Sequence, residues 1–196
     1  HIKEIAPMPI SETQNNIDAV VSFNGEDLDP QIETTHSFSG YSAMGVREAM
    51  VLLPRDKQKD AVEGIINLSD NPADMLTYKT ANSAFHNYYD NKPLKLTATL
   101  RASSLMDKAG PKYLFKIGEV IGKHVEMYHD MKRQLPIDIP FPHSETRTIT
   151  VQLPAGYKIL NPDAIRMHAD DAALSGKPTM GFNADYKLDG DKLLVN

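Results

Sequence analysis

The chain has 196 residues and a formal net charge of −5, and 24% of its residues are charged. This length suits one large domain or two small ones, which can bury about 70% of the unfolded surface without a disulfide or a metal. The acidic balance provides no basic footprint for nucleic acid. The chain has no cysteine, which excludes disulfides, thiolate zinc ligands and a cysteine nucleophile. No apolar run reaches the roughly 20 residues that span a bilayer.

The first part of the chain predicts a linker followed by a β-hairpin. Residues 1–16 are irregular and contain two prolines and a polar run, which is typical of a linker. Apolar residues then alternate with polar ones through 17–23, which predicts a half-buried strand. Asn24-Gly25 predicts a type I′ turn, because both residues tolerate a positive φ. The returning strand is expected at about residues 30–38.

Two helices are expected next. Gly40 interrupts the strand pattern, and apolar residues then recur three or four positions apart through 42–53, as on one face of a helix. Pro54 ends this helix. A second helix is expected at about 56–66, and the segment 67–75, which contains an Asp-Asn-Pro sequence, predicts a loop.

The rest of the chain contains further short strand patterns. The clearest is 93–102, where leucines and an alanine alternate with polar residues. Others are expected at 76–82, 148–153, 157–160, 162–168, 180–187 and 192–195, with a second hairpin signal at Asp189-Gly190. Residues 113–117 form a shorter apolar run, 118–135 have no clear assignment, and Pro136, Pro140 and Pro142 predict a stiff, extended connection.

Together these patterns predict a mainly β fold, a β-sandwich with a small helical insertion at about residues 42–66. The predicted organisation is a linker at 1–16, a β-sandwich domain at 17–135 and a β subdomain at 136–196. We expect the two β units to pack together as one.

Three stretches carry a family resemblance, and they are Phe38–Arg47, Lys116–Pro136 and Arg147–Asn161. Together, across about residues 17–195, they resemble the region downstream of the transglutaminase-like domain in large exported proteins of Bacteroidetes-type bacteria, which also carry a domain of unknown function. The resemblance implies export to the periplasm or cell surface of a Gram-negative bacterium. It also implies an upstream transglutaminase-like domain as the partner within the same polypeptide.

The resemblance transfers no catalytic residue to this chain. The family's Cys-His-Asp triad lies in the upstream domain, and this chain has no cysteine. The chain begins at His1 and stops at Asn196 directly after an apolar run at 193–195, so we expect both ends to be those of a fragment.

Two glycine-containing stretches resemble catalytic loops but fail on spacing. Gly40–Gly45 lies where a nucleophile elbow would lie, but its second glycine comes one residue late for G-x-S-x-G. We interpret Gly40 as a turn residue and Ser42 as a helix cap. Gly118–Lys123 has three residues between its glycines instead of the four of a phosphate-binding loop, and His124 follows where Ser or Thr is needed.

No metal or cofactor site is expected. His124 and His129 are five residues apart, which on a helix puts them roughly 140° apart rather than on one face, although a bend would bring them together. The acidic residues Asp170, Asp171, Asp185, Asp189 and Asp191 lack the spacing of a calcium loop, and Asp189-Gly190-Asp191 better fits a turn. The other histidines, His36, His86, His143 and His168, show no ligand spacing with one another.

The sequence therefore predicts a protein that is not an enzyme, with no catalytic, cofactor-binding or metal residues and no cofactor. The leading hypothesis is a non-catalytic accessory domain that packs on, or positions substrate for, the upstream transglutaminase-like domain. The alternative is an independent β-sandwich module that binds a glycan or peptide ligand, for which Tyr88-Tyr89 offers aromatic rings. An independent hydrolase is the weakest hypothesis. We also expect apolar residues at both ends either to pack against a neighbouring domain or to fold back onto the chain itself.

Overall fold

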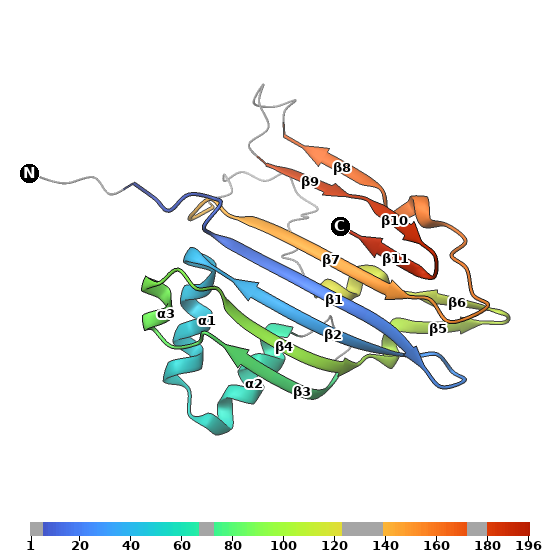
Figure 1. The fold of residues 1–196 in the computed structure, drawn as a ribbon, viewed down its shortest axis with the longest axis horizontal. Helices are drawn as coiled ribbons and strands as arrows, with labels where there is room; N and C mark the ends of the chain where they lie inside the picture. The colour runs from blue at the N-terminus through green and yellow to red at the C-terminus, as the bar shows by residue number, and fades with distance from the viewer. Residues whose placement is uncertain (1–5, 67–72, 123–138, 172–179) are drawn as a thin grey trace, which may run out of the picture.

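The computed structural model describes residues 6–66, 73–122, 139–171 and 180–196. Seven strands form one mixed sheet in the order β10-β11-β7-β1-β2-β4-β3 (Figure 1). Their bounds are β1 (Gln14–Asn24), β2 (Asp29–Phe38), β3 (Asp74–Ala81), β4 (Leu94–Arg101), β7 (Ser144–Gln152), β10 (Tyr186–Asp189) and β11 (Lys192–Val195). Two separate hairpins pair β5 (Met106–Ala109) with β6 (Lys112–Phe115) and β8 (Met167–Asp170) with β9 (Gly181–Ala184).

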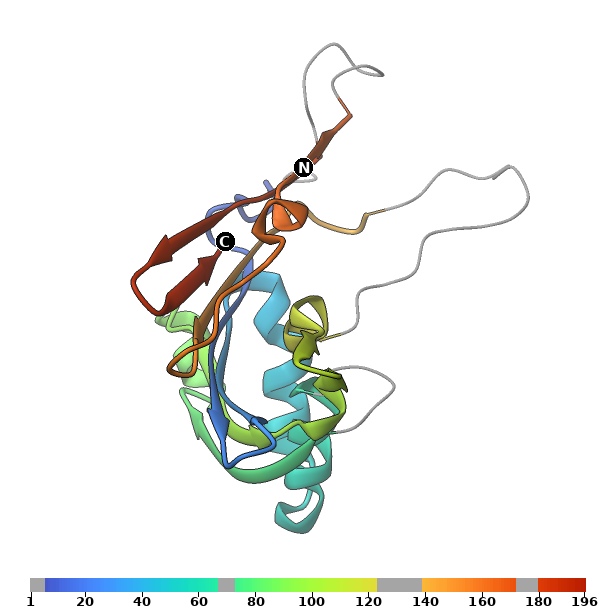
Figure 2. The same cartoon turned by 90° about the vertical axis from the view of Figure 1, so that its right-hand side faces the viewer.

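The two long helices, α1 (Gly40–Leu52) and α2 (Arg55–Ile66), cover one face of the large sheet (Figure 2). The other helical segments are the single-turn α3 (His86–Tyr89) and the short 3-10 helices η1 (Ser103–Leu105), η2 (Ile117–Ile121) and η3 (Pro162–Ile165). Strands take up 43% of the described residues against 25% for helices, which confirms a mainly β fold. A β-sandwich is not confirmed, because the described strands outside the large sheet form only two-stranded hairpins.

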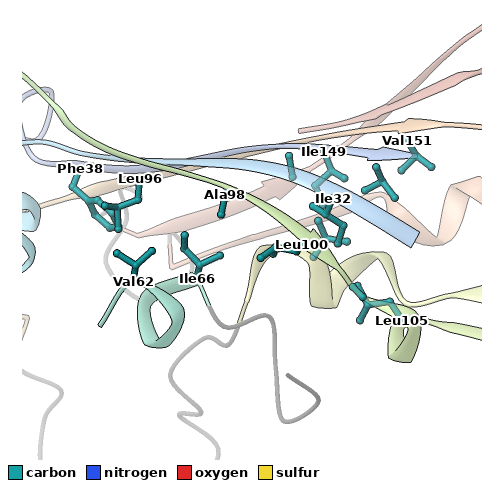
Figure 3. Close-up of a cluster of buried hydrophobic side chains, with 14 of the residues drawn as sticks. Ile32, Phe38, Val62, Ile66, Leu96, Ala98, Leu100, Leu105, Ile149 and Val151 are labelled. Atoms are coloured by element: carbon teal, nitrogen blue, oxygen red, sulfur yellow. The ribbon is translucent and has the colours of Figure 1, made fainter. Parts of the chain in front are cut away.

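The core lies between this sheet and the helices, and strand alternation explains which side chains enter it. In β1 the buried residues are Ile17, Ala19 and Val21, whereas the intervening Asp18 and Val20 are exposed on the opposite face. Figure 3 shows side chains of α2 approaching the sheet from the helical side. The labelled core residues are Ile32, Phe38, Val62, Ile66, Leu96, Ala98, Leu100, Leu105, Ile149 and Val151.

The C-terminal part of the chain contributes to the same sheet. β1 pairs with β2 in antiparallel fashion on one side and with β7 in parallel on the other, so Ile17 lies between His36 and Arg147. β11 then pairs antiparallel with β7, and β10 with β11. Strands from the predicted segments 17–135 and 136–196 therefore share one hydrogen-bonded sheet.

The start of α1 differs from its sequence prediction. The helix begins at Gly40, so Ser42 lies inside it and the prediction that Ser42 caps the helix is wrong. The residue before the helix is Ser39, whose Oγ donates a hydrogen bond to the Glu12 carbonyl oxygen at 2.7 Å instead of capping. Gly40 has φ +53°, and a Cβ there would lie 2.6 Å from that same carbonyl oxygen, so no other residue fits without strain.

Several local predictions are corrected by the backbone. The first hairpin forms, but Asn24 pairs with Asp29, so its loop has four residues and not the predicted type I′ turn at Asn24-Gly25. No strand forms at 157–160, where the Tyr157 N–H closes a turn by donating to the Pro154 carbonyl oxygen. The range 162–168 contains η3 and only the start of β8. The second hairpin is confirmed, with Asp189 paired to Lys192.

Candidate functional site

The candidate site begins with a strand that changes partners halfway along its length. β9 and β10 are separated only by Asp185, and together they make an almost continuous strand over 181–189. Its first half pairs with β8 and its second half with β11. At the junction, Asp185 exchanges two backbone hydrogen bonds with Asn196, of 2.9 and 3.0 Å.

The two partners lie on opposite edges of this strand. Backbone groups of successive residues in a strand point alternately to the two edges. Asp185 points to the edge that β11 occupies, so Gly181 and Asn183 point to that edge as well. The Met180 carbonyl oxygen accepts from the N–H of Asp171, so the even-numbered residues point to β8. β11 and β8 therefore flank the 181–189 strand from opposite sides.

Strand β7 is likewise paired along only part of one edge. On the β11 side, Ile149 to Gln152 pair with Val195 to Lys192. Within the described part of the chain, no strand pairs with residues 144–148 on that side. The Leu153 N–H donates to the Asp191 carbonyl oxygen at 2.7 Å, so odd-numbered residues of β7 point to this edge.

These two half-paired strands bound a place that one more strand segment would fill. We call it the open strand position, and it lies between residues 144–148 of β7 and residues 181–184 of β9, in line with the end of β11. Figure 1 shows the C-terminus between β7 and the β9–β10 strand. The backbone groups of Glu145, Arg147, Gly181 and Asn183 point towards it. Among the described residues, no backbone partner occupies it.

Charged side chains hold the hairpin region against η3. The Arg166 guanidinium contacts Asp185 Oδ1 at 3.0 Å and Asp163 Oδ1 at 3.1 Å, and lies 4.7 Å from the centroid of the Tyr186 ring. The Tyr186 hydroxyl donates to Asp163 at 2.9 Å, and this hydrogen bond raises the pKa of Tyr186. The backbone N–H of Tyr186 and the side chain of Arg166 lower the pKa of Asp185. This network ties Asp185, the residue between β9 and β10, to η3 through Arg166.

Large apolar side chains are exposed in the C-terminal part of the chain. Phe182 of β9 is 55% exposed and Met167 of β8 is 60% exposed, in a hairpin that projects beyond the helical layer (Figure 2). Further large exposed residues in the C-terminal region are Tyr157, Leu160, Met180 and Leu188. Single exposed apolar residues are normal on surfaces, but Phe182 and Met167 lie on one hairpin beside an unpaired strand edge, which is typical of a docking surface.

Buried polar groups with unused hydrogen-bonding atoms lie on β1 and β2, on the helical side of the sheet and across β7 from the open strand position. His36 is 5% exposed, and its Nε2 has no hydrogen-bond partner. Burial, and to a smaller degree the charge of Arg147, lowers the pKa of His36 to about 4, so the ring is neutral near pH 7. Thr34 Oγ1 and Asn15 Oδ1 are also buried without partners.

The side chain of Arg147 on β7 lies close to these buried groups. Its guanidinium donates to Glu145 Oε2 at 2.8 Å, to the Thr146 carbonyl oxygen at 3.2 Å and to the Asn15 carbonyl oxygen, while its Nε has no partner. Burial lowers the pKa of Arg147, and the carboxylate of Glu145 raises it. The Nε of Arg147 is thus a buried hydrogen-bond donor that remains unused.

A second buried arginine connects two helical segments. Arg47 of α1 is 2% exposed, donates to the Lys92 carbonyl oxygen and lies 5.9 Å from the centroid of the Tyr88 ring. It thereby ties α1 to α3 and the residues that follow it. Tyr89, the other half of the predicted tyrosine pair, is exposed and stacks edge-on against Tyr88 at 6.1 Å.

The glycine-containing motifs of the sequence form no catalytic cluster in the described part of the chain. Gly40–Gly45 is the first turn and a half of α1, where Ser42 has helical neighbours rather than a strained elbow. Gly118 lies in η2 and Gly122 directly follows it, and Val120 between them is fully buried. Lys123, His124 and His129 lie outside the described residues.

The described histidines and aspartates that were considered as metal ligands are not grouped together either. Among the described residues, no group of three or more His, Asp or Glu side chains is arranged to hold a metal ion. Asp185 contacts Arg166, and Asp189 and Asp191 flank the tight turn between β10 and β11. His168 lies 3.3 Å from Asp170 on β8.

Sequence reasoning missed the open strand position, because it arises from pairing between segments about 130 residues apart in the chain. Comparisons with protein-family models, curated proteins and solved structures found no match to this chain. Among the described helices, none combines the length and apolar character needed to cross a membrane.

Proposed function

We propose that this chain is a non-catalytic accessory domain of an exported, multidomain transglutaminase-like envelope protein, located in the periplasm or at the cell surface of a Gram-negative bacterium. In this proposal the chain docks on the transglutaminase-like domain that precedes it. The observation that carries the docking role is the pair of exposed apolar side chains, Phe182 and Met167, on the hairpin beside the open strand position. The resemblance in the sequence supports the choice of partner.

The lack of catalytic activity rests on chemistry. The covalent route of transglutaminase-like enzymes needs a thiolate nucleophile, which a chain without cysteine does not provide. We expect the purified chain to turn over no peptide or amide substrate. Turnover that a single substitution within this chain abolishes would contradict this part of the proposal.

A binding experiment with two matched variants tests the docking role. The chain and the transglutaminase-like domain are purified separately, and their affinity is measured by calorimetry. Phe182→Ser should weaken binding by about tenfold or more, because burying one aromatic side chain contributes about 1.5–3 kcal/mol. Phe85→Ser is the control, because Phe85 is 50% exposed but adjoins α3. Equal affinities for the two variants, or no binding by the unaltered chain, would contradict the proposal.

The second candidate is an independent module that binds a peptide or a glycan. The open strand position favours a peptide over a glycan, because its unpaired backbone groups match those of another strand. Binding of a peptide in the absence of any neighbouring domain would favour this candidate.

A further inference from the structure

Among the described residues, four buried polar atoms without a hydrogen-bond partner lie on one face of three neighbouring strands. They are Asn15 Oδ1 on β1, Thr34 Oγ1 and His36 Nε2 on β2, and Arg147 Nε on β7. The buried Ile17 of β1 pairs with both His36 and Arg147, so all three face the helical side of the sheet. Buried polar groups in folded proteins are almost always paired, so four neighbouring exceptions point to a partner that is not a side chain of these strands.

The strands on either side of Thr34 and His36 offer these two residues no polar side chain. Their neighbours on β1 and β4 are Ile17, Ala19, Leu96 and Ala98. All four are buried and apolar, so a change of rotamer on β2 brings neither the hydroxyl nor the imidazole to a partner on these strands. Water or another small polar molecule is the usual partner of buried groups that the chain leaves unpaired.

The charges beside these atoms cancel, which favours an uncharged ligand. Arg147 contacts Glu145 Oε2 at 2.8 Å, so the guanidinium already has its counter-charge. His36 is neutral near pH 7, because burial and, to a smaller degree, the charge of Arg147 lower its pKa to about 4. An anion or a cation here would lie in the core without a counter-charge, which is strongly unfavourable.

The hydrogen-bonding roles of the four atoms match hydroxyl groups, which both donate and accept. Arg147 Nε only donates, and Asn15 Oδ1 only accepts, since the amide nitrogen of Asn15 donates to Glu145 Oε1 at 3.2 Å. Arg147 also donates to the Asn15 carbonyl oxygen, so these two residues lie side by side. Thr34 and His36 are two positions apart on one strand, about 7 Å between their Cα atoms, which one oxygen can bridge with hydrogen bonds of about 3 Å.

We propose that this face of β1, β2 and β7 binds an uncharged ligand with two hydroxyl groups, supplied either by two water molecules or by a small diol. One hydroxyl lies between Thr34 and His36, and the other accepts from Arg147 Nε and donates to Asn15 Oδ1. We call this place the hydroxyl site. It uses side chains on the helical side of the sheet, and it does not rest on the proposed docking function.

Nuclear magnetic resonance of the whole chain tests the hydroxyl site. Nuclear Overhauser effects from water are measured at the Arg147 Nε–H and at the His36 ring, where a bound water molecule gives a long-lived contact. Titrations with ethylene glycol, a diol, and with inorganic phosphate, a charged probe, follow the same two signals. Thr34→Val replaces the hydroxyl in the site with a methyl group. Its matched control is Thr35→Val, on the opposite face of the strand, where Thr35 pairs with Thr97 at 3.1 Å.

We expect either water contacts at both signals, which assign the ligand to water, or saturable shifts of both with ethylene glycol, which assign it to a diol. Thr34→Val should abolish the water contact at His36, or weaken ethylene glycol binding by about fivefold, the share of one hydrogen bond. It should also lower the urea midpoint of unfolding. Thr35→Val should retain both the contact and the affinity.

Three results would overturn the inference. The first is that neither signal contacts water or shifts saturably with ethylene glycol. The second is that phosphate alone gives saturable shifts, since the ligand would then be charged. The third is a higher urea midpoint in Thr34→Val, because replacing a buried hydroxyl that has no partner by an apolar group of the same shape stabilises a core.

Discussion

Asp185 and Asn196 are the last residues that pair through their backbones between the β9–β10 strand and β11. The distance from the Asp185 nitrogen to the Asn196 oxygen is 2.9 Å, and the distance from the Asn196 nitrogen to the Asp185 oxygen is 3.0 Å. From Asp185 towards the N-terminus, the strand has its partner β8 on the opposite edge. This change of edge leaves one side of β9 facing the free half of β7. The geometry of one residue pair thus creates the position on which the proposed function depends.

A pair of glycine substitutions tests the account of α1. Gly40→Ala should lower the free energy of unfolding by about 2 kcal/mol or more, because φ is +53° and the new Cβ would lie 2.7 Å from Thr13 Oγ1. Gly45→Ala should raise it by up to about 1 kcal/mol, because Gly45 lies inside the helix with open space around it. Urea denaturation measures both. A stable Gly40→Ala protein would show that this turn is not constrained.

The buried His36 should make stability fall in mild acid. Its pKa is about 4 in the folded chain against 6.5 for an unperturbed imidazole, so the unfolded chain binds the proton more readily between these values. The free energy of unfolding should therefore fall as the pH drops from about 7 to 5, with about 2 kcal/mol due to this group.

The matched variants for this effect are His36→Leu and His168→Leu. The first should remove that part of the pH dependence, because no imidazole is left to protonate. The second should retain it, because the side chain of His168 is largely exposed. The comparison uses urea midpoints at the two pH values. The same acid response in His36→Leu as in the unaltered chain would refute the assignment to His36.

Arg47 should contribute more to stability than any surface charge nearby. Arg47→Ala should lower the free energy of unfolding by about 3 kcal/mol. The substitution leaves the Lys92 carbonyl oxygen without its donor and opens a space against Tyr88. Glu48→Ala, one residue along and exposed, should change stability by less than about 0.5 kcal/mol. Amide exchange should also speed up around α3 in Arg47→Ala alone. Equal effects of the two substitutions would contradict the role assigned to Arg47.

Metal analysis gives a further check. We expect no stoichiometric zinc or calcium after dialysis, because the sequence offers no His or carboxylate set on one face and the described residues hold no such cluster. Elemental analysis by mass spectrometry measures this directly. Near-stoichiometric metal in the dialysed protein would refute the expectation.

Elements with strong local periodicity could be predicted from the sequence. Leu94, Leu96, Ala98 and Leu100 alternate in the sequence and are all buried in β4, because alternation alone decides which face a strand buries. Asp189-Gly190 likewise led to the right hairpin, since Gly190 has φ +61°. Local conformational preference was sufficient in both cases.

Features that depend on distant contacts could not be predicted. Asn24-Gly25 suggested a tight turn, but pairing with the following strand begins only at Asp29, with Leu28 at φ +56°. The parallel pairing of β1 with β7 joins segments about 130 residues apart, and no local pattern encodes its register. The open strand position follows from that register, so it became visible only in the fold.

The most direct test of the central claim is residue-resolved amide hydrogen exchange by NMR, with the transglutaminase-like domain absent and present. Docking of that domain over the open strand position predicts slower exchange at Glu145, Arg147, Gly181 and Asn183, whose N–H groups point into this position. It predicts little change at Thr146, whose N–H already donates to Asn16 Oδ1 at 3.2 Å. Unchanged exchange at all four residues when the domain is bound would contradict the account.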